Sequence, residues 1–129
     1  MSQEKLDTEE ILVELAKKII GGNEVNNILN NPNEFPTELI ENLSLTTALK
    51  YWKGEINYVE GDYIINNLYS FWLTKDYYLN YGFSEIAWEC YEAFDAGEYF
   101  RSDDDRKIDP AEKYTKPLIE EILKRKNKI

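Results

Sequence analysis

The stretch Ser84-Glu-Ile-Ala-Trp-Glu-Cys-Tyr-Glu-Ala-Phe-Asp-Ala-Gly97 decides the fold class of this chain. Its apolar residues recur at intervals of three and four, so Ile86, Cys90 and Phe94 fall on one face of a helix. Ser84 is a typical N-cap residue, and Gly97 is a typical residue just beyond a helix end. The stretch therefore predicts an amphipathic helix with one buried face.

Similar patterns occur on both sides of this stretch and predict six further helices. Asp7 and Asp109 each begin a capping box, and Ser44 is interpreted as the N-cap that separates the third helix from the fourth. Pro117 predicts a kink or a break of the last helix near Thr115. The expected helices cover 8–20, 24–29, 36–43, 45–53, 62–78 and 110–123. The result is an irregular all-α bundle of six or seven helices, with an extended connector over 55–59 or, alternatively, a minor strand pair near 55–63.

Length and composition predict one domain spanning residues 1–129. The chain has 129 residues, of which 43% are hydrophobic and 14% aromatic, which is enough to fill a single core. No apolar run approaches the roughly 18 to 20 residues that span a bilayer. The segment Met1–Asp7 has no apolar signal core, so the expected location is the cytoplasm.

Several catalytic chemistries lack their residues. The chain has no histidine and one cysteine, Cys90, so neither a Cys-His or Ser-His-Asp centre nor a zinc site of Cys and His ligands is expected. Asp103–Asp105 is followed by Arg106 and Lys107, where a calcium loop needs oxygen ligands and glycine. The segment 98–107 is interpreted as a solvated acidic loop, with a weak metal site as the alternative. No catalytic residue, metal or cofactor is predicted.

The charge of the chain is its most informative functional feature. The formal net charge is −10, and residues 83–105 carry eight acidic residues against one base, Arg101. Glu85, Glu89 and Glu92 are spaced at four and three, which predicts one stripe opposite the apolar face. Such a surface repels nucleic-acid phosphates and attracts a basic protein. The alternative is a solvated face that only keeps the protein soluble.

We therefore predict a partner-binding surface on this helix and the segment that follows it. Acidic residues would steer the partner, whereas Tyr99 and Phe100 would supply aromatic anchors. The predicted residues are Glu85, Glu89, Glu92, Asp95, Glu98, Tyr99, Phe100, Asp103, Asp104 and Asp105. The expected partner is a basic protein, and neither direct nucleic-acid binding nor membrane binding is expected.

In size, acidity, low cysteine content and lack of a catalytic constellation, the chain resembles the small immunity proteins that bacteria pair with secreted polymorphic toxins, including those of contact-dependent inhibition systems. The resemblance extends over the whole chain and rests on no motif, so it assigns no role to any single residue. It implies an inhibitor without enzymatic activity that blocks a cognate toxin domain, such as a nuclease with a basic cleft. Two alternatives remain: an acidic mimic of nucleic acid that inhibits a DNA-binding defence protein, and a carboxylate-based enzyme or metal-binding protein.

Overall fold

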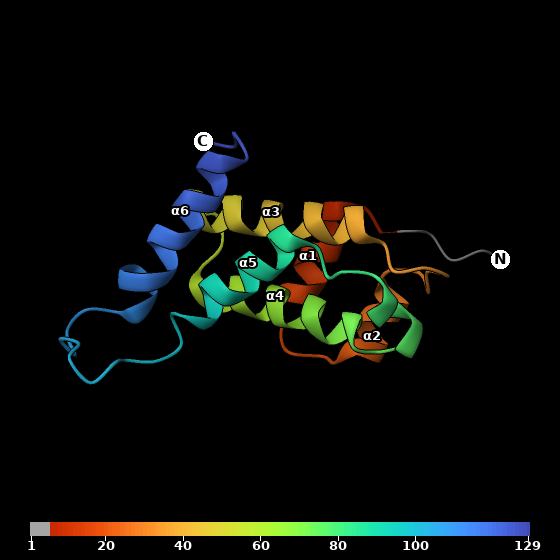
Figure 1. Cartoon of the computed structure of the whole chain (residues 1–129), viewed down its shortest axis with the longest axis horizontal. Helices are drawn as coiled ribbons and strands as arrows, with labels where there is room; N and C mark the ends of the chain where they lie inside the picture. The colour runs from red at the N-terminus through yellow and green to blue at the C-terminus, as the bar shows by residue number, and fades with distance from the viewer. Residues whose placement is uncertain (1–5) are drawn as a thin grey trace.

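In the computed structural model, which describes residues 6–129, six α-helices and two short helical turns pack around one hydrophobic core (Figure 1). The elements are α1 (Thr8–Ala16), α2 (Gly22–Ile28), α3 (Thr37–Lys53), α4 (Tyr58–Trp72), the 3-10 turn η1 (Asp76–Asn80), α5 (Glu85–Asp95), the π-helical turn η2 (Ala111–Thr115) and α6 (Lys116–Arg125). The all-α prediction is confirmed, and no strand occurs within residues 6–129. Met1–Lys5, on which most of the signal-segment prediction rests, lie outside the described residues.

Helix α5 lies at the centre of the arrangement and contacts α3, α4 and α6. Figure 1 shows α6 at one end of the bundle and α2 at the opposite end, with the connection between α5 and α6 swinging out beyond the helices. Phe71 of α4 and Phe94 of α5 are fully buried at the core. The outer side of α5 is left open to solvent between α4 and α6.

Helix α1 ends four residues earlier than the apolar pattern predicts. Its capping box forms as expected, because Asp7 and Glu10 exchange hydrogen bonds of 2.8 and 3.1 Å. At the other end, the fully buried Asn67 of α4 donates to the carbonyls of residues 15 and 18 and accepts from the amide of Ile20. These three tertiary hydrogen bonds replace helical ones, so the chain leaves the helix after Ala16.

The predicted third and fourth helices are one helix, α3, and the assignment of Ser44 as an N-cap is wrong. Ser44 is fully buried in the middle of α3, where its carbonyl faces the thiol of Cys90 at 3.9 Å. The buried positions Ile40, Leu43, Thr47 and Ala48 continue the same helical face across it. Because that face is uninterrupted, core packing overrides the local capping preference of serine.

Helix α4 begins before the predicted start, in the segment interpreted as a connector or strand. Asn57 and Glu60 form a capping box through hydrogen bonds of 2.8 and 2.9 Å, so both the connector interpretation and the strand alternative are wrong from residue 58 onward. The helix also ends earlier, at Trp72. Tyr78, expected near its end, lies instead in η1, where its hydroxyl donates to the carbonyl of Pro32 at 2.9 Å.

The kink or break predicted near Thr115 is present only as a change of helix type: the π-helical turn η2 ends at Thr115, and α6 follows directly with Pro117 in its first turn. Thr115 and Lys116 keep right-handed helical backbone angles, so the chain does not leave the helix. The buried Thr115 hydroxyl donates to the carbonyl of Ala93 at 2.7 Å and ties this junction to α5. Gly97 permits the close approach, since a Cβ atom there would lie 2.9 Å from the Cα atom of Ala111. None of the helices in residues 6–129 combines the length and apolar character needed to cross a membrane.

Candidate functional site

The solvent-facing side of α5 carries a line of four exposed residues, Glu85, Trp88, Glu92 and Asp95, which we call the α5 ridge. Their spacings of three, four and three place them on one side of the helix, opposite the buried Cys90. The helix is held in register at its start by Ser84, whose hydroxyl accepts from the amide of Ala87 at 3.3 Å. The ridge thus presents three carboxylates and one indole, which is 41% exposed.

An aromatic cluster borders the ridge where α5 packs against α4. Tyr69 and Tyr91 lie with ring centroids 4.5 Å apart, and Tyr91 stacks on Trp88 at 5.6 Å with an interplanar angle of 22°. Trp72 and Phe83 extend the cluster, with their centroids 5.5 Å apart. A shallow concavity of about 440 Å³ opens beside Trp72, Phe83 and Trp88. It can accept an apolar side chain from outside the molecule.

At the other end of the α4–α5 interface, Asp62 of α4 and Glu98 lie within hydrogen-bonding reach of each other, and Asp95 of α5 is near enough for its charge to act on Asp62. We call them the acidic triad. Burial raises the pKa of Asp62 to about 7, and the charge and hydrogen bonding of Glu98 act in the same direction, as does Asp95. Asn66 opposes the shift by donating to Asp62 Oδ1 at 3.0 Å. No Lys or Arg among residues 6–129 forms an ion pair with the triad.

Tyr91 connects the acidic and aromatic ends of this face. Burial raises the pKa of its hydroxyl, and the nearby charge of Asp95 adds to the effect. Burial likewise raises the pKa of Tyr58, whose hydroxyl donates to the carbonyl of Phe94, and Asp62 contributes to that shift. The α4–α5 face therefore changes from carboxylates at one end to aromatic rings at the other.

A groove of about 420 Å³ separates α5 from α6 on the other side of the ridge. Ala93, Ala96, Leu118 and Ile122 form its apolar part, and Glu89, Glu92, Glu121 and Arg125 supply its charges. Glu89 Oε1 accepts from Arg125 Nη2 at 2.6 Å, whereas Glu89 Oε2 is buried and has no hydrogen-bond partner in the described part of the chain. Glu121 Oε1 lies 3.9 Å from Arg125 Nε.

The segment after α5 is less solvated than the sequence suggests. Asp104, predicted to lie in a solvated loop, has a side chain only 5% exposed. It accepts from Lys113 Nζ at 2.6 Å, from the Tyr114 hydroxyl and from the amide of Arg101 at 2.7 Å. These hydrogen bonds, led by that of Lys113, hold the pKa of Asp104 well below its usual range. The charge of Asp104 is therefore compensated by Lys113 of the same chain.

The two aromatic residues of this segment are partly covered by arginine side chains. The Arg101 guanidinium carbon lies 4.2 Å from the centroid of Tyr99, and that of Arg106 lies 4.7 Å from the centroid of Phe100. Tyr99 is nevertheless 56% exposed, and Asp103 and Asp105 face solvent. Tyr99 therefore stays accessible to a partner, with a cation already on one side of its ring.

The ten predicted partner-binding residues thus lie in three places. Glu85, Glu92, Asp95 and Glu98 belong to the α5 ridge and the acidic triad, Glu89 lies in the α5–α6 groove, and Tyr99, Phe100 and Asp103–Asp105 lie in the following segment. Glu89 lies on the same side of α5 as Glu85 and Glu92, as the spacing predicts, but its side chain is only 32% exposed because it pairs with Arg125 of α6. Trp88 is not among the predicted residues, although its spacing to Glu92 and Asp95 is the signal for it. No pattern in the sequence indicates Asp62, because only the packing of α4 on α5 brings it close to Glu98.

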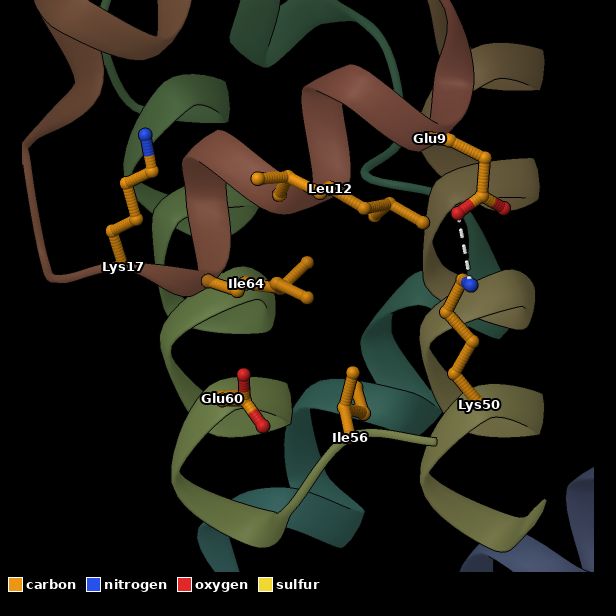
Figure 2. Close-up of a pocket in the computed structure, with 9 residues that line it drawn as sticks. Glu9, Leu12, Lys17, Lys50, Ile56, Glu60 and Ile64 are labelled. Atoms are coloured by element: carbon orange, nitrogen blue, oxygen red, sulfur yellow. Dashed lines mark ion pairs between the residues drawn. The ribbon is translucent and has the colours of Figure 1, made fainter. Parts of the chain in front are cut away.

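A separate cavity of about 240 Å³ lies between α1, α3 and α4. Figure 2 shows Leu12, Ile56 and Ile64 converging on it, while Lys17 points away. On one side, Glu9 and Lys50 form an ion pair of 2.9 Å that links α1 to α3. The cavity has room for one aliphatic side chain or a small apolar molecule, and the acid and base at its side, Glu9 and Lys50, are paired with each other.

Cys90, the single cysteine of the sequence, lies in the core as a structural residue. Cys90 is fully buried, and burial, with a contribution from the charge of Glu89, raises its pKa to about 12. A thiol with so high a pKa is a poor nucleophile at neutral pH. Among residues 6–129, no group of three or more Asp, Glu or Cys side chains has the arrangement of a metal site.

No protein-family model matches this chain, and no similar curated protein or solved structure was found. The α5 ridge and the surfaces beside it are therefore the features that bear on function.

Proposed function

We propose that this chain is a binding protein that neutralises a basic protein partner, as an immunity protein neutralises its cognate toxin. The observation that carries the proposal is the α5 ridge between the aromatic cluster and the acidic triad. Aromatic side chains supply much of the binding energy at protein interfaces, and surrounding charges set the rate and selectivity of association. This surface combines both in one place.

The acidic triad supports a cationic partner in particular. Asp62 and Glu98 repel each other when both are charged, and no base of the described chain compensates them. A Lys or Arg of a partner would remove this repulsion and add a charge-assisted hydrogen bond. The free protein is thus less stable at this place than the complex would be.

In this proposal, the carboxylates of the ridge attract the partner and Trp88 anchors it. The aromatic cluster supports Trp88 from below, so little side-chain freedom is lost on binding. Tyr99 and Phe100 follow the C-terminal end of α5, beyond Asp95 and Glu98, and would widen the contact. A toxin cleft that normally binds a phosphate backbone would then be occupied by carboxylates and closed to its substrate.

The proposal is tested with the protein encoded immediately upstream of this chain's gene. We expect that protein to be basic and to arrest growth when expressed alone, and we expect co-expression of this chain to restore growth. Reversal of the ridge charges in a Glu92→Lys/Asp95→Lys variant should abolish the rescue and slow association at low salt by at least about tenfold.

The matched control reverses two acids elsewhere, Glu14→Lys and Glu24→Lys, which lie on α1 and α2. It changes the net charge equally and should still rescue growth. The proposal is contradicted if the upstream protein neither binds nor harms the cell, and also if both double variants lose rescue to the same extent.

One observation favours a second candidate, a carboxylate-based activity. Asp62, with a pKa of about 7, is poised to give up a proton near neutral pH, as a general acid does. The discriminating variant is Asp62→Asn, which abolishes general-acid chemistry but removes only one carboxylate of the binding surface. A binding protein should lose only part of its affinity, because the ridge carboxylates and Glu98 remain. Retained growth rescue by this variant would favour the binding protein.

A further inference from the structure

We infer that the α5–α6 groove is a receptor for an arginine side chain of the partner, which deepens the proposed function and rests on it. The groove joins an apolar floor to carboxylates on both walls. An arginine has the matching form, because its aliphatic stem can cover alanine and leucine side chains while its guanidinium meets carboxylates.

The groove already shows how it binds a guanidinium. Arg125 reaches across from α6 and donates to Glu89 Oε1 at 2.6 Å, and it lies 3.9 Å from Glu121 Oε1. It leaves Glu89 Oε2 buried without a donor. A carboxylate oxygen without a donor is costly, and Oε2 is out of contact with solvent, so a guanidinium that displaces Arg125 and meets both oxygens of Glu89 would remove that cost.

The charges of the groove also favour a second cation. Three carboxylates, those of Glu89, Glu92 and Glu121, line it against the single guanidinium of Arg125. Glu92 forms no ion pair with any residue in 6–129 and belongs to both the groove and the α5 ridge. A partner seated on the ridge would therefore have the groove within reach of its own side chains.

Arginine is the occupant rather than lysine because of geometry. A guanidinium is planar and can donate to two carboxylate oxygens at once, whereas an ammonium is a strongly hydrated point charge. Glu89 and Glu92 are three residues apart on α5, so their carboxylates approach the groove from adjacent turns. One guanidinium can join them.

The test needs no natural partner. The isotope-labelled full-length protein is titrated with N-acetyl-arginine-N-methylamide while amide shifts are followed by NMR. The citrulline analogue serves as the neutral probe of the same shape. We expect saturable shifts in residues 89–96 and 118–125 with the arginine probe only.

Four variants test whether the affinity for the arginine probe changes in the expected direction. Glu89→Gln should weaken probe binding about tenfold, and Glu92→Gln, which changes an exposed residue, should weaken it in the same direction if Glu89→Gln folds poorly. Arg125→Gln should strengthen binding, because it frees Glu89. Lys124→Gln makes the same change in net charge outside the groove and should strengthen binding less.

The inference is overturned by equal shifts with the citrulline probe, by shifts spread over every acidic surface, or by equal effects of Arg125→Gln and Lys124→Gln. Such a result would leave the partner test of the α5 ridge standing. Conversely, failure of the growth rescue would leave a measured guanidinium site in place.

Discussion

Replacement of Asp62 by asparagine should stabilise the protein at alkaline pH and leave it unchanged near pH 4. In the folded chain, burial and Glu98 raise the pKa of Asp62 from 3.8 to about 7. Between these values the folded state holds a proton that the unfolded state has lost. The free energy of unfolding of the wild type therefore falls as pH rises from about 4 to about 7, and is flat above that as far as this group is concerned.

The size of the effect follows from the same shift. At about 1.4 kcal/mol per pKa unit, the rise from 3.8 to about 7 corresponds to at most about 4 kcal/mol. Because Asp62 is only half-buried, solvent screening reduces this to about 1–2 kcal/mol. Asparagine keeps the oxygen that accepts from Asn66, so the variant removes charge and little else.

The assay is urea unfolding followed by circular dichroism at pH 4.5, 6 and 8. We expect Asp62→Asn to exceed the wild type by about 1–2 kcal/mol at pH 8 and to match it at pH 4.5. Glu98→Gln should give part of the same gain, and the double variant should gain less than the two together, because both relieve one repulsion. Glu24→Gln is the control for net charge. An equal gain of Asp62→Asn at pH 4.5 and pH 8 would refute the reasoning.

Three further outcomes follow from the packing. Asn67→Ala should lower the free energy of unfolding by about 2–4 kcal/mol, because one buried and two part-buried backbone groups lose their partner. Asn42→Ala, at an exposed position, should change it little, and urea unfolding distinguishes the two. Gly97→Ala should cost about 1–3 kcal/mol and lower the melting temperature, since the added Cβ would lie 2.9 Å from backbone of η2 that cannot move aside. The thiol of Cys90 should not react with an aromatic disulfide reagent at pH 8 in the native protein and should react fully in denaturant, with rapid reaction of the native protein as the contrary result.

The sequence predicts a helix correctly where its local capping signals agree with the pattern of buried residues. Ser84, the apolar spacing and Gly97 together predict α5 almost to the residue, and Pro117 marks the place near Thr115 where the helix changes from π to α. The Asn57–Glu60 capping box is a local signal of equal quality, but the β-branched and aromatic residues around it favour an extended conformation.

The features that the sequence does not predict depend on tertiary contacts. The end of α1 depends on Asn67, some fifty residues away along the chain, which no local pattern can reveal. The polar half of α5 was evident from its spacing, but how far Glu89 is exposed depends on where α6 packs. Asp104 looked solvated for the same reason, since Lys113 and Tyr114 reach it only in the folded chain.

Trp88 is partly exposed to water and lies among carboxylates, so its fluorescence can report on the ions and molecules near α5. The quenching of indole emission by dissolved ions depends on their concentration around the ring. Relative to its effect on free tryptophan, caesium should therefore quench Trp88 more strongly than iodide does, and this difference should shrink as salt is added. Trp88→Phe separates this emission from that of Trp52 and Trp72. Any macromolecule resting on α5 would shut both ions out, which makes occupancy readable without a dye.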